Sequence, residues 1–184
     1  MNHNYPVSDE ALIKAAKRGD REAAAWLYHR YVDKVHRICY RIVLDPSQVQ
    51  DCVQEVWLKV FHSLDGFRSG RSFAAWLNTV TANTAIDYYR KYVRQKNHHK
   101  AHKDYVETQA TDERPDEAHI QKQIQTALEE ISVNQRAAFT LRYFQDMPTP
   151  EIARTLGCAE GTVRVHIRRA LLALRARLAG KLNQ

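Results

Sequence analysis

Arginines gathered near the C-terminus have the clearest capacity for chemistry in this sequence. A first segment with apolar residues at helical spacing begins at Thr149 and Pro150 and ends at Gly157. The arginines belong to a second segment of this kind, which begins near Glu160. A glycine between two periodic segments predicts a helix-turn-helix, because glycine adopts the left-handed conformation that ends a helix. Arginines on the second helix can pair with guanine in the major groove or grip phosphates. The outward positions of that helix include Arg164, Val165, Arg168 and Arg169.

A second polar group follows one face of the helix predicted to begin after Ser72. Its members share helical spacing and combine aromatic, amide and charged side chains: Trp76, Thr79, Asn83, Asp87, Arg90 and Arg94. An amide and an indole can hydrogen-bond to and stack on unpaired bases, while arginines hold the phosphate backbone. An unremarkable ion pair within the helix, between Asp87 and Arg90 or Lys91, is the alternative interpretation.

The loop before this helix, residues 65–72, carries two glycines, two arginines and one aromatic ring. This composition suits phosphate contact and base stacking. The expected contact residues are Asp65, Gly66, Phe67, Arg68 and Ser69. The alternative is an ordinary surface turn in which the Phe67 ring tucks back into the core.

A third surface belongs to the helix predicted to start at Asp45 and Pro46. Its buried face consists of Val49, Val53, Val56, Val60 and Leu64, and the opposite face carries Asp51, Gln54, Glu55, Leu58 and His62. Leu58 therefore lies in the middle of a polar surface, as the anchor of a helix-docking interface does. Single exposed leucines are common, so a leucine without function is the alternative.

No group of residues indicates catalysis or a metal site. Asp51 and Glu55 form a carboxylate pair one turn apart, but no third ligand accompanies them. Zinc or copper binding by the histidine tract around residues 98–102 is an open alternative. The three cysteines are far apart and odd in number, which favours small buried side chains over a disulfide framework, with a redox role at Cys158 as an alternative. We expect no enzyme activity, no metal and no cofactor.

The elements that must position these residues are all helices. The chain contains only six glycines and five prolines. Its apolar residues recur three and four residues apart, and no segment alternates apolar and polar residues for long. Ser8 and Asp20 are expected to cap two helices separated by Gly19, and Asp45 and Thr149 to cap two more. An all-α fold follows.

The charges divide the 184 residues into three parts. Residues 1–96 carry net +5, residues 97–133 net −4 and residues 134–184 net +6, which together make the total of +7. We expect two small helical domains, 1–96 and 120–184, joined by a flexible acidic linker, 97–119, which has almost nothing to bury. The basic domains indicate a polyanionic partner, nucleic acid before membrane. No apolar run spans a bilayer and the N-terminus does not resemble a signal peptide, so we expect a cytoplasmic protein without membrane insertion.

Taken in order, these segments resemble the extracytoplasmic-function (ECF) group of bacterial sigma-70 factors. The resemblance covers nearly the whole chain and rests on three motifs. The first is Asp51 to Phe61, and the second is Phe73 to Leu77 together with Asn83, Asp87 and Arg90. The third is Glu151 to Ala153 together with Gly161, Thr162, Val163 and Arg164. It implies that the first domain is sigma region 2 and the last is region 4. Val165 and His166 stand where a Ser-Arg pair is expected, so no particular upstream DNA sequence is implied.

The resemblance also implies partners for each surface. Asp51, Gln54, Glu55 and Leu58 match positions that dock on the β′ clamp helices of RNA polymerase core, and region 4 is expected to meet the β flap. Residues 65–69 and the stripe of Trp76, Asn83, Asp87 and Arg90 match positions that melt and read the −10 element. Thr162, Arg164, Val165, Arg168 and Arg169 match the −35 recognition helix. An anti-sigma factor is a further expected partner.

Two rival hypotheses come from different classes of protein. One is a metal-dependent sensor enzyme or regulator that uses His98, His99 and His102, and the other is a helix-turn-helix regulator that acts without polymerase. A stand-alone helix-turn-helix regulator would use residues 1–96 for ligand sensing or dimerisation. Such a regulator binds duplex DNA unaided, whereas ECF factors generally bind promoters well only within the polymerase holoenzyme.

Overall fold

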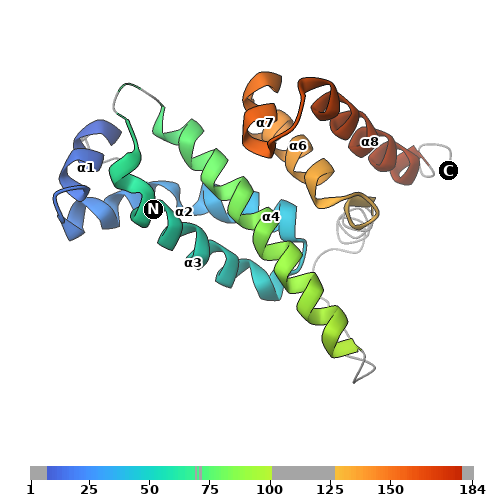
Figure 1. Cartoon of the computed structure of the whole chain (residues 1–184), viewed down its shortest axis with the longest axis horizontal. Coiled ribbons are helices and arrows are strands. Elements are labelled where there is room, and N and C mark those ends of the chain that lie inside the picture. The colour runs from blue at the N-terminus through green and yellow to red at the C-terminus, as the bar shows by residue number, and fades with distance from the viewer. Residues whose placement is uncertain (1–7, 69, 71, 101–126, 180–184) are drawn as a thin grey trace. The chain divides into compact units, whose positions relative to one another are not determined.

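The computed structural model describes residues 8–68, 70, 72–100 and 127–179. Within these ranges the regular structure is helical and contains no strand, which confirms the all-α prediction (Figure 1). The helices are α1 (Asp9–Ala16), α2 (Arg21–Val43), α3 (Pro46–Ser63), the 3₁₀ turn η1 (Leu64–Gly66), α4 (Phe73–Lys100), α6 (Val133–Phe144), α7 (Thr149–Leu156) and α8 (Glu160–Ala179). The chain divides into two compact units, Met1–Ala85 and Ile86–Gln184, so the boundary falls within α4.

Side-chain caps fix the helix starts in the first unit. Ser8 Oγ accepts from the Ala11 amide at 3.3 Å, and the Asp20 carboxylate accepts from the Glu22 and Ala23 amides at 2.9 and 3.1 Å. Asp45 caps α3, with Pro46 in its first turn. Each cap satisfies amides that have no partner inside the helix, which stabilises the fold by about 1 kcal/mol. The capping signals expected from the sequence are confirmed at these three positions.

The core of the first unit lies between α2, α3 and the first half of α4. The predicted valine face of α3 is confirmed, since Val49, Val53, Val56, Val60 and Leu64 are all buried. Helix α2 packs against α3, and Val35, Ile38 and Ile42 of α2 and Leu77 of α4 are buried as well. Full burial of one such side chain stabilises the fold by roughly 1.5–3 kcal/mol. Cys39 and Cys52 lie in the same core, where a hydrogen bond between their thiols and burial raise the pKa of Cys39.

Helix α1 is tied to α2 by a buried face and by one carboxylate. Leu12 and Ile13 are buried, while the Asp9 carboxylate accepts from Arg30 Nη1 at 2.7 Å and from the Tyr31 hydroxyl. Burial and the hydrogen bond to Asp9 raise the pKa of Tyr31, so the phenol remains a donor over the physiological range. The short helix is thereby held in one orientation on α2.

The second unit contains the predicted helix-turn-helix. Ser132 and Gln135 form a reciprocal capping box at the start of α6. Gly157 ends α7 in the left-handed conformation (φ 62°), and α8 begins three residues later, as predicted. One detail differs from the sequence prediction: α7 includes Thr149 as its first residue, with Pro148 in the cap position and no side-chain capping bond. Pro148 already has the extended conformation of a cap, so Pro150 falls one position later in the first turn.

The structure describes only the beginning of the predicted linker, residues 97–119. Helix α4 continues to Lys100, four residues into the segment predicted as a linker, and residues 101–119 of that segment lie outside the described residues. None of the helices among the described residues is both long and apolar enough to cross a membrane.

Candidate functional site

The outward face of α3 carries an apolar anchor within a polar border. Asp51, Gln54 and Leu58 are exposed, and the Leu58 side chain has 72% of its surface accessible. Glu55 is half-buried and pairs with Lys59, Oε1 to Nζ, at 3.4 Å. The four predicted residues thus share one accessible face, which is the arrangement that helix docking requires.

Phe61 extends this face and was missed by sequence reasoning. Its ring is 38% exposed and packs at 5.5 Å from the buried ring of Trp57. Because Phe61 follows Leu58 by three residues, the two side chains lie one turn apart on the helix. That spacing was the available signal, but an aromatic residue next to a valine face is more readily assigned to the core.

The loop predicted to contact DNA is only partly accessible. Asp65, Gly66 and Arg68 are exposed, whereas Ser69 lies outside the described residues. Phe67 departs from the expectation of a stacking platform, because its side chain is only 6% exposed. Its ring lies 5.6 Å from that of Phe73 and 5.3 Å from that of Trp76. After η1 the chain turns back over the start of α4, and burying the ring among aromatic neighbours is favoured over exposing it.

A lysine from α1 holds this loop. Lys17 Nζ donates to the backbone carbonyl oxygens of Asp65, at 3.0 Å, and of Phe67, at 2.6 Å. About 50 residues separate the lysine from its acceptors along the chain. No local sequence pattern links them, so sequence reasoning could not find this contact.

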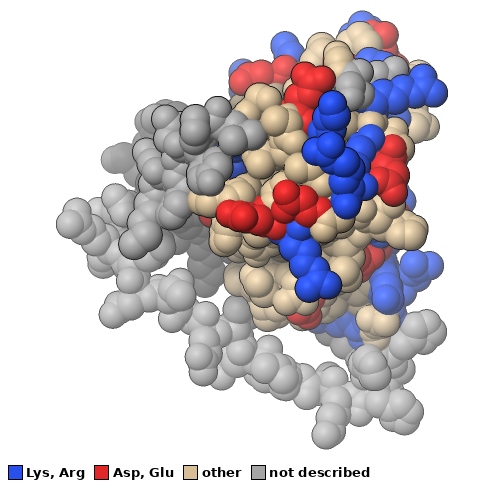
Figure 2. Space-filling model, turned by 90° about the vertical axis from the view of Figure 1, so that its left-hand side faces the viewer, with Lys and Arg blue, Asp and Glu red and all other residues tan. Residues whose placement is uncertain are grey.

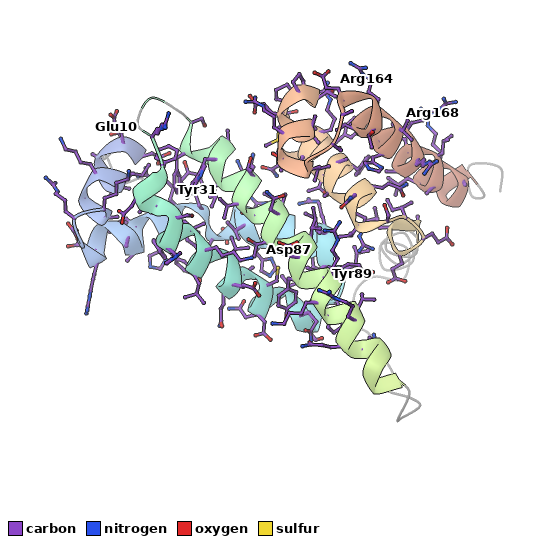
Figure 3. All side chains as sticks on the ribbon, in the orientation of Figure 1. Glu10, Tyr31, Asp87, Tyr89, Arg164 and Arg168 are labelled. Carbon is purple, nitrogen blue, oxygen red and sulfur yellow. The ribbon has the colours of Figure 1, made fainter. Side chains whose placement is uncertain are left out.

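The stripe on α4 is accessible along most of its length. Asn83, Asp87 and Arg90 are exposed, while Trp76 is half-buried against Phe67 and Phe73. Figure 3 shows Asp87 near the middle of α4. Both interpretations of the charged pair find support, since Arg90 lies 3.9 Å from Asp87 and is also accessible. Within the second unit, Arg90 Nη2 donates to Asn134 Oδ1 at 3.1 Å.

The outward face of α8 matches the sequence prediction closely. All five predicted residues are exposed: Thr162, Arg164, Val165, Arg168 and Arg169. Arg164 and Arg168 project from the same outer side of the helix in Figure 3. Arg164 pairs with Glu160 at 3.2 Å, an exposed contact that DNA phosphates or bases can replace. Val163 and Ala170 are fully buried on the opposite side and hold α8 in place.

The metal alternatives find no support among the described residues, which contain no group of three or more potential ligands. His98, His99 and His102 lie beyond the part of the chain whose side chains are described. The cysteines are free, with Cys39 and Cys52 buried and Cys158 half-buried in the turn.

Comparison with known proteins identifies the family. Residues 27–95 match the family model described as "Sigma-70 region 2", and residues 121–174 match the one described as "Sigma-70, region 4". The chain belongs to the ECF group of sigma-70 factors. It is an alternative sigma factor that directs promoter-specific transcription initiation, and sigma factors as a family are not enzymes.

Relatives in two bacteria align with this sigma factor over most of their length. It is 26% identical to the ECF RNA polymerase sigma factor SigW of Bacillus subtilis over 179 residues, covering 90% of this chain and 94% of SigW. It is 29% identical to the ECF RNA polymerase sigma-E factor of Escherichia coli K12 over 177 residues, covering 89% and 91%.

Two solved structures share its fold. The sigma factor RpoE in complex with the anti-sigma factor NepR from Bartonella quintana has a TM-score of 0.69 at 22% identity, over 85% of this chain and 97% of RpoE. CnrH in complex with the cytosolic domain of CnrY has a TM-score of 0.66 at 24% identity, over 94% and 98%. The two-part helical architecture is therefore common to all three proteins.

Proposed function

We propose that three faces of this sigma factor divide the work of initiation among them. The α3 face, with Asp51, Gln54, Glu55 and Leu58, docks on the β′ clamp helices of core RNA polymerase. The exposed loop residues Asp65, Gly66 and Arg68 and the exposed α4 residues Asn83, Asp87 and Arg90 open and hold the −10 element, with Trp76 at the base of that surface. The α8 residues Thr162, Arg164, Val165, Arg168 and Arg169 contact the −35 element in the major groove.

The observation that carries this proposal is the exposure of Leu58. An accessible leucine surrounded by carboxylates and amides has no role in the fold of α3, since the valines on the opposite face make the core. A protein–protein interface uses such a residue as its buried centre. Docking by α3 brings core polymerase to the same chain that carries two DNA-binding faces, which a sigma factor requires.

The remaining partners follow from the same role. Region 4 is expected to contact the β flap, and an anti-sigma factor is an expected inhibitor, as NepR accompanies RpoE in its complex. We place the protein in the cytoplasm, where RNA polymerase works. The proposed mechanism is non-covalent and leaves the chemistry to the polymerase, so this chain itself needs no catalytic residue, metal or cofactor.

The division of labour between the two DNA faces is tested in reconstituted holoenzyme. The promoter is first recovered by sequencing the DNA that the holoenzyme protects. Arg168→Ala should weaken binding to the upstream element by ~1–3 kcal/mol if the contact is bidentate. Asn83→Ala should bind the closed promoter normally and lower the permanganate reactivity of thymines in the −10 element. An Asn83 variant that melts DNA normally would contradict the −10 assignment.

The stand-alone regulator is distinguished by a simpler measurement. A helix-turn-helix regulator binds duplex DNA without help, so the isolated chain would then bind the recovered promoter as tightly as the holoenzyme does. We expect specific protection only when core polymerase is present.

A further inference from the structure

The C-terminal end of helix α1 contacts the loop of residues 65–68 through the side chain of Lys17. Lys17 is the residue after α1, and its ammonium group donates to the carbonyl oxygens of Asp65 and Phe67, on either side of Gly66. Hydrogen bonds from a charged donor are about twice as strong as neutral ones. The two acceptors lie on the backbone, so this contact fixes the course of the chain and not one side chain.

We propose that Lys17 is a positioning residue for the −10 element, which holds residues 65–68 in the shape that receives the unpaired strand. The inference rests on the proposed function in one respect, namely that this loop meets the −10 element. It assigns the role to a residue outside the three faces already described. Lys17 acts on the DNA through the loop.

The anchor at the other end of α1 makes this lysine effective. Asp9 accepts from Arg30 and Tyr31 of α2, and Leu12 and Ile13 are buried, so α1 is fixed before Lys17 extends from it. A flexible lysine on a loose helix would not define a backbone. On this anchored helix its ammonium group is held within hydrogen-bond distance of both carbonyls.

A second line of contacts runs from the same anchor to the loop. Tyr31, which donates to Asp9, packs its ring 5.3 Å from that of Phe73, and Phe73 lies 5.6 Å from Phe67. The ring of Phe67 is thus fixed by aromatic packing, while its backbone carbonyl accepts the hydrogen bond from Lys17. Gly66, between the two acceptors, has no side chain to pack and lies in η1, which is closed by the Phe67 amide donating to the Leu64 carbonyl at 3.0 Å, so Lys17 adds to a turn that the backbone already forms.

The surface around α1 does not suggest that Lys17 is part of a broad phosphate-binding patch. Acidic and basic side chains are interspersed over the described part of the face in Figure 2. Lys17 is itself half-buried, and its two hydrogen bonds to the loop are to backbone carbonyl oxygens. A direct phosphate contact is therefore an outcome that the experiment must separate from positioning.

The test compares three variants of the full chain. Lys17→Met keeps the length of the side chain and removes its donors, while Lys17→Arg keeps both charge and donors. Lys14→Met removes the same charge from an exposed position on the same helix and is the matched control. Hydrogen exchange of the backbone amides in residues 65–68 is measured in the free protein, and thermal unfolding establishes that each variant is folded.

We expect the Lys17→Met variant to exchange roughly tenfold faster in this loop, with α3 and α4 unchanged. In holoenzyme it should bind a fluorescent non-template oligonucleotide spanning the −10 element about tenfold more weakly. Lys17→Arg should recover most of both losses, and Lys14→Met should match the wild type. Binding to core polymerase should be the same for all of them.

Two results would overturn the inference. One is wild-type exchange in the loop of Lys17→Met. The other is weaker oligonucleotide binding by Lys17→Met that is also seen with Lys14→Met, or that is not accompanied by faster exchange in the loop. Either result would indicate that the lysine charge acts directly on a DNA phosphate. Failure of the proposed function is visible separately, because Asn83→Ala would then bind the oligonucleotide normally in the same assay. If Asn83→Ala fails to bind while Lys17→Met is normal, the −10 surface stands and the positioning role falls.

Discussion

Leu58 is the exposed side chain on which the proposed docking of the α3 face depends most. Truncating it removes the apolar anchor of the α3 face without touching the core, because the valines of α3 lie on the other side. We predict that Leu58→Ala and Glu55→Ala each weaken binding to core polymerase, the leucine variant by ~2 kcal/mol or more. Fluorescence titration of labelled sigma factor with core measures the loss.

The control for this prediction is Glu22→Ala, which removes an exposed carboxylate from α2. It should bind core as the wild type does. Unchanged affinity in both α3 variants, with normal helical content by circular dichroism, would remove the docking assignment from this face.

His166 makes the stability of the protein depend on pH. Burial, with Arg169 nearby, lowers the pKa of this imidazole, and its Nδ1 is buried without a hydrogen-bond partner among the described residues. The unfolded chain then takes up a proton below pH ~6.5 that the folded protein does not bind, so the free energy of unfolding falls as the pH drops through that range. The loss stops growing once the pH is below the lowered folded pKa.

Urea midpoints at pH 7.5 and pH 5.5 check this prediction. His166→Gln should reduce the difference between the two midpoints, because the titrating group is gone. His36→Gln, an exposed histidine on α2, should keep the wild-type difference. Equal pH dependence in the wild type and His166→Gln would show that other groups control it.

Residue types and helical spacing were enough to predict that most of the proposed site residues are exposed, but not the contacts that depend on distant neighbours. The α8 arginines and Leu58 follow from periodicity alone, since one face of each helix is plainly apolar. Phe67 was ambiguous, because a loop aromatic can stack on a base or pack inward, and only the positions of Phe73 and Trp76 decide between these. Lys17 could not be predicted, as its acceptors are backbone atoms of a different segment.

At the scale of the element, the turn between α7 and α8 depends on one backbone conformation. Gly157 has φ 62° and ψ 38°, and a Cβ added there would meet no atom within 4 Å. We predict that Gly157→Ala destabilises the second unit by about 1 kcal/mol, because a residue with a Cβ is strained in the left-handed region. Gly157→Asn should cost less, since asparagine tolerates this conformation better.

Gly161→Ala supplies the matched comparison. Gly161 lies in the first turn of α8, and its Cβ would also meet open space, but its φ is not in the left-handed region. We expect this change to stabilise α8 slightly, by less than about 1 kcal/mol. Thermal denaturation of both variants separates the two effects, and equal destabilisation would show that loss of glycine itself, not its φ, matters.

Helix starts and stops were the most predictable level of the fold. Ser8, Asp20 and Asp45 cap helices as their side chains require, and Gly157 ends α7. The exceptions lie at ends without a decisive signal. Helix α4 has no glycine or proline near residue 96, so its hydrogen-bonded backbone continues to Lys100.

At the scale of the whole molecule, charge and the family resemblance predicted two helical parts around an acidic segment. The compact units of the structure are Met1–Ala85 and Ile86–Gln184, and the second half of α4 makes contacts with α6 inside the second unit. Tyr89 is covered by the Arg136 guanidinium at 4.3 Å, and Arg90 donates to Asn134. Contacts of this kind depend on tertiary placement, which a helical pattern does not contain.

The last prediction concerns residues 97–119, a segment whose charge opposes that of the basic parts on either side. It holds three basic and six acidic side chains, a net charge of −3. We propose that this tether passes through the polymerase channel, where its acidic groups occupy the path of the transcript, since one chain must reach both DNA elements at once. A Gly/Ser replacement of equal length should then alter the pattern of abortive transcripts, while a shuffled segment of the same composition should largely preserve it. An unchanged pattern with the Gly/Ser segment would mean that only the length of the tether matters. If the replacement instead changes DNA binding by the free protein, and added salt abolishes that change, the tether covers a basic face, because salt screens such a contact over about 10 Å.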